Sequence, residues 1–138
     1  SRPLKTTEEL KTIVESVVSR YNKREVKSSV QRVFQAIRIE VNGELEGLYD
    51  FILSLADVTA KGGRIAIITF HSLEDRIVKR AFNELCTGCV CPPNLPICVC
   101  GHKPVAKFVN KKPITATEEE LKENTRASSA KLRVIEIL

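Results

Sequence analysis

The five cysteines of the chain have the spacing that most directly suggests chemistry, because all of them fall within fifteen residues. They follow the pattern C-x2-C-x-C-x6-C-x-C, and a histidine stands two residues beyond the last one. Thiolate and imidazole groups at such spacings could close a tetrahedral zinc site. The candidate ligands are Cys86, Cys89, Cys91, Cys98 and Cys100, with His102 as a sixth.

Other interpretations of these cysteines stay open, because their spacing differs from the usual pair of C-x2-C knuckles. An odd number of clustered cysteines, in a chain without an export signal, fits a disulfide scaffold poorly. A metal site or a redox-sensitive loop fits better. A reduced surface loop stiffened by prolines, or adventitious disulfides, are the structural alternatives.

A second polar group, Thr69–Arg76, follows an apolar run at what we expect to be the carboxyl end of a strand. Ligands of open α/β sheets bind beyond such ends. His71, Ser72 and Asp75 could form hydrogen bonds to a ligand there. The structural alternative gives each a local role: Ser72 caps the following helix, Asp75 complements the helix dipole, and His71 is a satisfied turn residue.

Several catalytic and nucleotide-binding motifs are missing from the sequence. It contains no Gly-x-Ser-x-Gly elbow, no Walker loop and no Gly-x-Gly-x-x-Gly. Gly62-Gly63 precedes the expected strand, whereas a phosphate loop follows one. The chain therefore offers no nucleotide-cradling motif of its own.

Three amphipathic helices are predicted in the first part of the chain. The first opens with a capping signature, Thr6 to Glu9, and ends in a basic polar stretch, Asn22–Ser29. The second spans Ser29–Val41, and the third runs from about Glu44 to Ala60, closing at Gly62-Gly63. The apolar stripes of the first two helices are Leu10, Ile13, Val14, Val17, Val18 and Tyr21, and Val30, Val33, Phe34, Ile37 and Val41.

The second part of the chain is predicted to alternate strand and helix. The apolar run Arg64–Phe70 is nearly continuous, which is typical of a parallel strand covered on both faces. A helix opening at Ser72 follows, and further strands are expected at Val105–Val109 and Leu132–Leu138. Helix, glycine pair, buried strand, polar turn and helix together indicate half of a doubly wound α/β fold.

Composition and charge favour a globular protein with a polyanionic partner. The net charge is +5 and the pI about 9.0. Residues 1–42 carry nine Lys and Arg against five Asp and Glu, and residues 101–138 carry eight against five. Ordinary surface solvation remains an alternative explanation for these charges. No apolar run approaches the ~18–20 residues that span a membrane. No signal peptide is visible in the polar N-terminal residues Ser1–Lys5, so we expect a cytoplasmic protein.

Two long segments resemble signatures of a known enzyme family. Val33–Leu45 (VFQAIRIEVNGEL) and Gly62–Lys79 (GGRIAIITFHSLEDRIVK) resemble the bacterial methyltransferases that modify the exocyclic N4 of a cytidine in small-subunit ribosomal RNA. The ending Asn124–Arg133 looks like the family's terminal motif, with Thr125 and Ser128 as small departures. The loop around Cys91-Pro92-Pro93 resembles an insertion found in only some members.

The resemblance implies a class I methyltransferase with a helical domain inserted into a Rossmann-like sheet. Residues 1–43 would finish the inserted domain on the substrate side. Residues 44–138, with the Cys-rich loop 86–102, would supply the C-terminal half of the sheet. In the family the donor loop, the ribose-binding acid and the catalytic segment precede the insertion, so no S-adenosylmethionine contact and no catalytic residue can be carried over to this chain.

The expected enzyme is therefore S-adenosylmethionine-dependent, with zinc as an additional ion and ribosomal RNA or the small ribosomal subunit as partner. The missing N-terminal half of the same protein is the other expected partner, and this chain alone should be inactive. The RNA-facing candidates, chosen by polarity and position, are Arg32, Gln35, Arg38, Asn42, His71, Ser72, Arg126, Lys131 and Arg133. Two alternatives are a non-enzymatic RNA- or protein-binding module stapled by zinc, and a redox-responsive cysteine protein.

Overall fold

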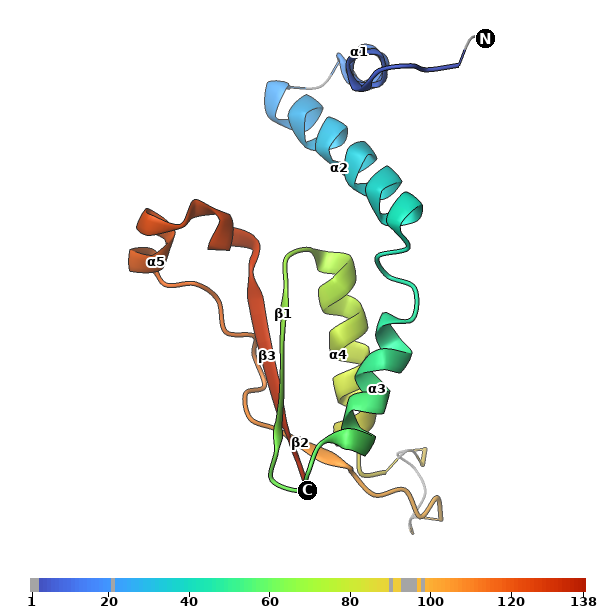
Figure 1. The fold of residues 1–138 in the computed structure, drawn as a ribbon, viewed down its shortest axis with the longest axis vertical. Coiled ribbons are helices and arrows are strands. Elements are labelled where there is room, and N and C mark those ends of the chain that lie inside the picture. The colour runs from blue at the N-terminus through green and yellow to red at the C-terminus, as the bar shows by residue number, and fades with distance from the viewer. Residues whose placement is uncertain (1–2, 21, 90, 93–96, 98) are drawn as a thin grey trace. The chain divides into compact units, whose positions relative to one another are not determined.

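The computed structural model describes residues 3–20, 22–89, 91–92, 97 and 99–138. Two compact units make up the chain, Ser1–Glu44 and Leu45–Leu138 (Figure 1). Within the described residues, the first unit contains two helices, and the second combines helices with a small sheet. An α/β composition, as the sequence predicts, is confirmed.

The first unit consists of α1 (Thr7–Val18) and α2 (Lys23–Asn42). The capping box predicted for α1 is confirmed: Thr6 Oγ1 accepts from the Glu9 amide at 3.2 Å, and the Glu9 carboxylate accepts from the Thr6 amide at 3.3 Å. The prediction that α2 starts at Ser29 is wrong. Asn22 Oδ1 accepts from the Glu25 amide at 3.0 Å, and this cap extends the helix through the basic stretch.

The apolar stripes of α1 and α2 stay partly exposed. Neither helix contains a buried residue among those described. Ile37, expected in a core, is 44% exposed, and Val41 is 77% exposed. The expected position Tyr21 lies outside the described residues. Two helices bury too little apolar surface to enclose a core, so these stripes stay partly open within the unit.

The second unit begins with α3 (Leu48–Val58), which is shorter at both ends than the predicted Glu44–Ala60. Gly47 precedes it with φ +68°, a left-handed conformation that favours glycine. The chain leaves the helix at Thr59, in an extended conformation. Gly62 (φ +79°) then turns the chain, and a side chain at Gly63 would lie 2.7 Å from the Ala60 carbonyl oxygen. The glycine pair therefore makes the turn after the helix, and is not its C-cap.

In the described part of the chain, the sheet has three strands in the order β1-β3-β2: β1 (Arg64–Thr69), β2 (Ala106–Phe108) and β3 (Lys131–Ile137). The central strand runs antiparallel to both neighbours, with Ile65 opposite Ile135 and Phe108 also opposite Ile135. The expectation of β1 as a parallel strand is therefore wrong for its pairing with β3. β3 lies between β1 and β2 and runs opposite to both, and no local pattern in β1 reveals this direction.

The helices α3 and α4 (Ser72–Cys86) lie on one face of the sheet, as Figure 1 shows. Residues from both helices and all three strands form the core, which contains Ile52, Ile65, Val78, Ala81, Phe82, Leu85, Ala106, Ile135 and Ile137. The residues of β1 alternate, with Ile65 and Thr69 buried and Ile68 57% exposed. The prediction that both faces of this strand are covered is therefore wrong within the described chain.

Two short elements connect β2 to β3. They are α5 (Glu118–Glu123), capped by the Thr117 side chain, and the 3-10 helix η1 (Thr125–Ser129), of which Ala127 is buried. An isolated bridge pairs Ile114 with Leu132 beside the sheet. Among the described residues, the helices are all too short or too polar to cross a lipid bilayer.

Candidate functional site

The turn between β1 and α4 is held by a reciprocal pair of hydrogen bonds between His71 and Glu74. His71 Nδ1 accepts from the Glu74 amide at 3.3 Å, while Glu74 Oε2 accepts from the amides of Phe70 and His71 at 2.9 and 3.2 Å. The N-cap is therefore His71, and the expectation of Ser72 in that role is wrong. Ser72 is the exposed first residue of the helix.

The second nitrogen of His71 is enclosed but not engaged in a hydrogen bond. His71 Nε2 lies 3.2 Å from Glu74 Oε1. The direction of this contact does not meet hydrogen-bond geometry, and the buried Nε2 has no hydrogen-bond partner among the described residues. Because Nδ1 accepts a bond only when it carries no proton, the cap requires Nδ1 to be unprotonated.

Asp75 joins the first turn of α4 to the last strand. Its Oδ1 accepts from Arg133 Nε at 2.7 Å, and its Oδ2 accepts from Arg133 Nη2 at 3.1 Å. Lys131 Nζ lies 3.5 Å from the same Oδ2. Arg133 and Lys131 stand on the face of β3 that packs against α4, because they pair with Ile67 and Thr69 of β1. Their side chains therefore converge on one carboxylate.

The Arg133 guanidinium holds the pKa of the Asp75 carboxyl below its ordinary value, chiefly through this hydrogen bond. Burial works in the opposite direction, and Lys131 adds a smaller attraction. The ion pair is well enclosed, since the Arg133 and Asp75 side chains are 12% and 13% exposed. Bidentate pairs of this kind fix geometry as well as charge. Thr69, also buried, donates to the Lys131 carbonyl at 3.4 Å and ties the strand ends together.

These contacts give the expected RNA-facing residues of the second unit different roles. Arg133 pairs with Asp75 and is largely covered, whereas the Lys131 side chain is 41% exposed. Arg126, in η1, is exposed. The structure thus brings His71, Lys131 and Arg133 to one end of the sheet. A role in RNA contact stays a prediction for all of them.

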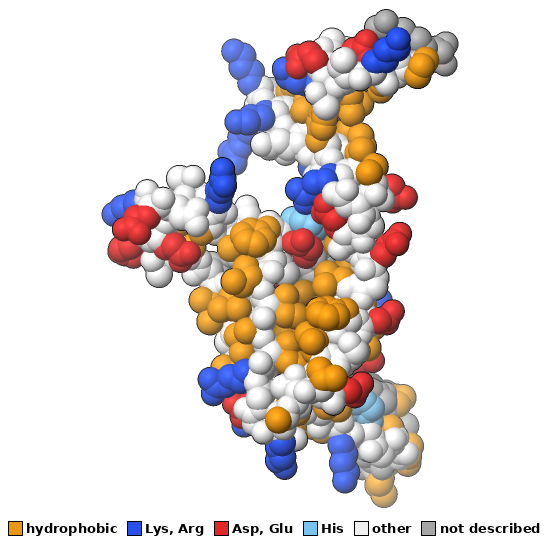
Figure 2. All heavy atoms as spheres, in the orientation of Figure 1, with side chains coloured by type: hydrophobic (Ala, Val, Ile, Leu, Met, Phe, Trp, Pro, Cys, Tyr) orange, Lys and Arg blue, Asp and Glu red, His pale blue; other side chains and the backbone are white. Residues whose placement is uncertain are grey.

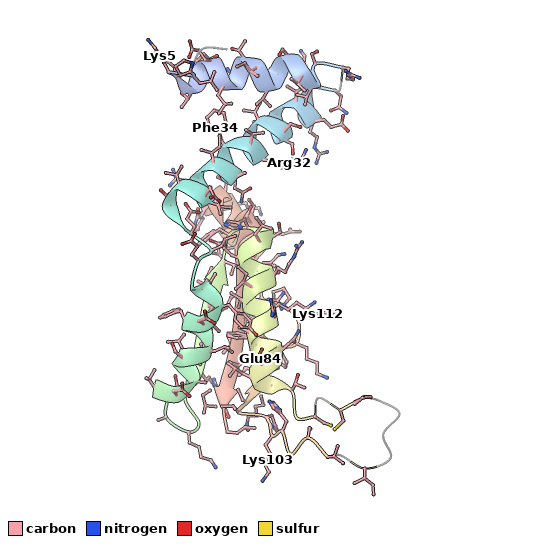
Figure 3. All side chains as sticks on the ribbon, turned by 90° about the vertical axis from the view of Figure 1, so that its right-hand side faces the viewer. Lys5, Arg32, Phe34, Glu84, Lys103 and Lys112 are labelled. Carbon is pink, nitrogen blue, oxygen red and sulfur yellow. The ribbon has the colours of Figure 1, made fainter. Side chains whose placement is uncertain are left out.

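The expected RNA-facing residues of the first unit lie along α2. Arg38 donates from Nε and Nη2 to Glu44 Oε2 at 3.2 and 3.0 Å, and Asn42 Nδ2 donates to Glu44 Oε1 at 2.9 Å. The Arg38 side chain stays 57% exposed. Arg32 contacts Ser29 Oγ at 3.3 Å and is exposed (Figure 3, where it is labelled), while Gln35 is half-buried.

A groove between α1 and α2 extends this polar surface toward the start of α2. Three lysines line it, together with polar and apolar residues: Lys11, Glu15, Ser19, Lys23, Val26, Lys27, Val30 and Gln31. Lys27, Gln31 and Gln35 follow one another at intervals of four along the helix, so they form a single ridge. Sequence reasoning did not include Lys23 and Lys27, because it placed them outside the helix.

Figure 2 shows hydrophobic side chains gathered over the sheet of the second unit. Ile68, Phe70 and Ile114 are each more than half exposed. Ile68 and Ile114 also line a shallow pocket with Ala116 and Leu132. This face is opposite to the one that α3 and α4 cover.

Part of the cysteine loop comes together in space. The sulfur atoms of Cys89, Cys91 and Cys100 all lie within 4.8 Å of one another. Cys86, at the end of α4, is not in this group, and neither is His102, whereas Cys98 lies outside the described residues. Burial raises the pKa of the Cys86 thiol to about 11.

Comparison with known proteins covers the whole chain. Residues 1–138 match the model of the MraW methylase family. Curated relatives of the chain carry the name "Ribosomal RNA small subunit methyltransferase H". The protein of Oleidesulfovibrio alaskensis is 48% identical over 97% of this chain and 42% of its own length. The proteins of Ruminiclostridium cellulolyticum and Finegoldia magna are 48% and 47% identical, each over 99% of this chain and 44% of their own length. The chain thus spans less than half the length of these relatives.

Proposed function

Because the chain belongs to the MraW methylase family, we propose that it forms the C-terminal part of an S-adenosylmethionine-dependent methyltransferase acting on cytosine N4 of small-subunit ribosomal RNA. The observation that carries this proposal is the family match over all 138 residues. The relatives named as ribosomal RNA methyltransferases support the substrate class. The alternative of a non-enzymatic module has no such support, since the family is one of enzymes.

The architecture supports different roles for the two parts of the chain. Residues 44–138 supply one end of a Rossmann-like sheet, in which β3 runs antiparallel between two strands that are parallel to each other. In the described residues, β3 is the only strand that pairs with β1, and the outward face of β1 exposes Ala66 and Ile68. An edge and a face of this kind can be covered by further strands and helices of the same protein.

Residues 1–43 supply helices of an inserted substrate-side domain. Support comes from the absence of buried residues in the described parts of α1 and α2, whose apolar stripes need additional helices for burial. The ridge Lys27, Gln31, Gln35 with Arg38 and Asn42 then offers cations and amides to an RNA strand. Lysine and arginine bind phosphate, while amides can contact base edges.

The chemistry explains why the rest of the protein is required. The lone pair of cytosine N4 is conjugated with the ring, so methyl transfer from a sulfonium needs close alignment of the two reactants. An acceptor must also take the N4 proton. The sequence has no glycine-rich donor loop, so residues outside this chain bind the donor. The role that we propose for this chain is to hold and orient the RNA. The working enzyme acts in the cytoplasm, where small ribosomal subunits are found.

Two measurements test this proposal. Calorimetry on the 138-residue chain should detect no S-adenosylmethionine binding, while the full-length enzyme should bind the donor. The full-length enzyme should also transfer a labelled methyl group to small ribosomal subunits, and nuclease digestion with mass analysis should place it on N4 of a cytidine. Donor binding at micromolar concentration by the chain alone, or methylation on another atom, would contradict the proposal.

A further inference from the structure

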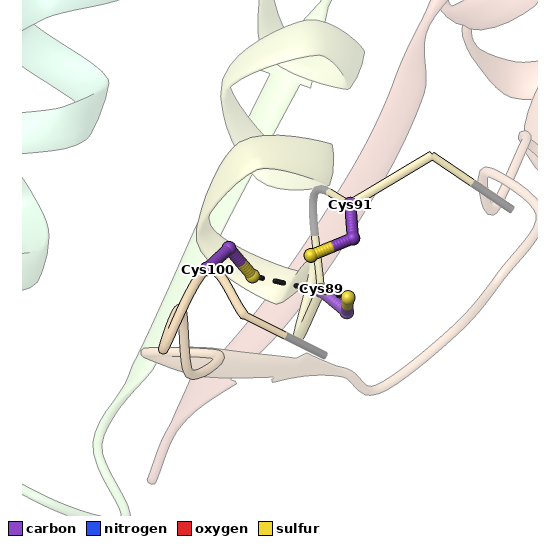
Figure 4. A group of neighbouring side chains, drawn as sticks. All are labelled: Cys89, Cys91 and Cys100. Carbon is purple, nitrogen blue, oxygen red and sulfur yellow. Dashed lines mark hydrogen bonds between the residues drawn. The ribbon is translucent and has the colours of Figure 1, made fainter. Parts of the chain in front are cut away.

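Three thiols of the loop between α4 and β2 are close enough to share one ligand. The Sγ atoms of Cys89 and Cys100 are 3.8 Å apart, and Cys91 Sγ completes a group within 4.8 Å. Figure 4 shows the three side chains converging from two separate stretches of the loop. The residues come from both sides of the loop, so their approach depends on how its ends are held.

The ends of the loop are fixed by contacts with the core. The Val105 amide donates to the Leu85 carbonyl at 2.8 Å, and the Leu138 amide donates to the Val105 carbonyl at 3.0 Å. The first bond joins the last turn of α4 to the residue before β2, and the second joins that residue to the end of the chain. A methyl group at Gly88 would lie 3.4 Å from Pro104, so the two stretches run close together there. Cys89 and Cys100 lie just beyond this closed base.

Cys100 Sγ donates a hydrogen bond to Cys89 Sγ at 3.8 Å, so the two sulfurs are in contact without forming a disulfide. Sulfurs in a disulfide are about 2.0 Å apart. Zinc binds thiolates at about 2.3 Å in a tetrahedron, which places its sulfur ligands about 3.8 Å from one another. The observed 3.8 Å between Cys89 and Cys100 agrees with the second arrangement. Cys91, within 4.8 Å of both, needs only a small displacement to reach the same ion.

We propose that the thiolates of Cys89, Cys91 and Cys100 bind one zinc ion, which closes the loop between α4 and β2. Thiolate ligands favour a soft or borderline divalent ion over magnesium or calcium. Three thiolates leave one tetrahedral position for a fourth ligand. Cys86 lies outside the group of three sulfurs and is therefore not assigned as a ligand. This inference concerns the loop alone and does not depend on the proposed methyl transfer.

Elemental analysis of the 138-residue chain, purified in a phosphine reductant without chelators or added metal, tests the proposal. We expect about one zinc ion per chain, and less than about 0.2 would overturn the proposal. Replacing zinc with Co²⁺ should give the visible absorption of a tetrahedral site and thiolate-to-cobalt charge transfer. Absence of both bands on titration with Co²⁺ alone would also overturn it.

Single substitutions identify the ligands. Cys89→Ser, Cys91→Ser and Cys100→Ser should each lower zinc affinity at least tenfold in competition with a chelating dye, while Cys86→Ser should retain the parent affinity. The far-UV circular dichroism spectrum of each variant should match that of the parent, which shows that the fold is kept. Loss of zinc affinity in Cys86→Ser as well, with an unchanged spectrum, would contradict the assignment. Equal zinc affinity in all four variants would overturn the assignment.

Discussion

Asp75 and Arg133 are 58 positions apart in the sequence, yet the guanidinium Nε lies 2.7 Å from the carboxylate Oδ1. The bond connects the first turn of α4 to β3, the central strand of the sheet. It therefore fixes the start of the helix, including the His71 turn, relative to β3. The stability of this end of the sheet should depend on that one carboxylate.

Asp75→Asn should lower the free energy of unfolding by about 3 kcal/mol, because it leaves the enclosed Arg133 without a counter-charge. Urea unfolding followed by circular dichroism measures the change. Asp57→Asn, at an exposed carboxylate of α3, is the matched control and should change stability by less than about 0.5 kcal/mol. Equal changes in the free energy of unfolding for the two variants would show that the ion pair with Arg133 does not stabilise the fold.

The same pair predicts a dependence on acid. The folded-state pKa of Asp75 lies below its ordinary value of 3.8, so the unfolded chain takes up the proton first as pH falls. The stabilisation is complete above about pH 5 and is lost as pH falls through the folded pKa. Unfolding free energies measured from pH 6 downward should therefore fall more steeply in the parent than in Asp75→Asn. Parallel curves would contradict this explanation.

His71→Ala should destabilise the chain by about 1 kcal/mol through loss of the α4 cap. His71→Asn should restore most of it, because an Asn side chain can accept from the same Glu74 amide. Ser72→Ala is the informative control and should be nearly neutral, since Ser72 does not cap the helix. Thermal melting of the three variants makes the comparison. A larger loss of stability for Ser72→Ala than for His71→Ala would mean that Ser72, and not His71, caps the helix.

Arg38→Ala in the full-length enzyme should weaken binding to ribosomal RNA and reduce the salt dependence by about 0.7–0.9 units of slope, as for one lost phosphate contact. Folding should change by less than about 1 kcal/mol, because the pair with Glu44 is exposed. Glu44→Gln frees Arg38 from its counter-charge and should leave RNA affinity equal or higher. If Arg38→Ala lowers stability but leaves RNA affinity unchanged, Arg38 has only a structural role, through its ion pair with Glu44.

Tyr49 provides a test of how α3 and α4 are joined. Its hydroxyl donates to the Glu84 carboxylate, and Arg80 lies over its ring at 4.8 Å from the centroid. The hydrogen bond to Glu84 is the main cause that raises the pKa of Tyr49 above 10.0. Stability from this bond is full below the unfolded pKa and is lost as pH rises through the folded pKa.

The two tyrosines of the chain and its lack of tryptophan make this titration measurable. In a Tyr21→Phe background, tyrosinate absorption reports Tyr49 alone, and its midpoint should lie above that of the urea-unfolded chain. Glu84→Gln should move the folded midpoint back toward the unfolded one. A midpoint that does not respond to Glu84 would contradict the contact.

The sequence by itself determined the features that depend on neighbours a few positions apart. The capping box of Thr6 and Glu9, the amphipathic helices and the strand at Arg64–Thr69 all arise from spacings of two to four residues, where backbone geometry sets which side chains meet. The long motifs from Val33 to Lys79 were enough to indicate the enzyme family. The clustering of the cysteines was also visible in the sequence.

Only the tertiary structure decided which distant residues meet. The reversal of β3, the exposure of one face of β1 and the pairing of Arg133 with Asp75 follow from strand register, which no local pattern in β1 encodes. His71, and not Ser72, is the N-cap of α4 because the chain stays extended through His71 after β1, and the helix starts only at Ser72. The end of α4 holds Cys86 against the core, away from the other cysteines. The contacts that close the base of the loop bring Cys100 close to Cys89 and Cys91.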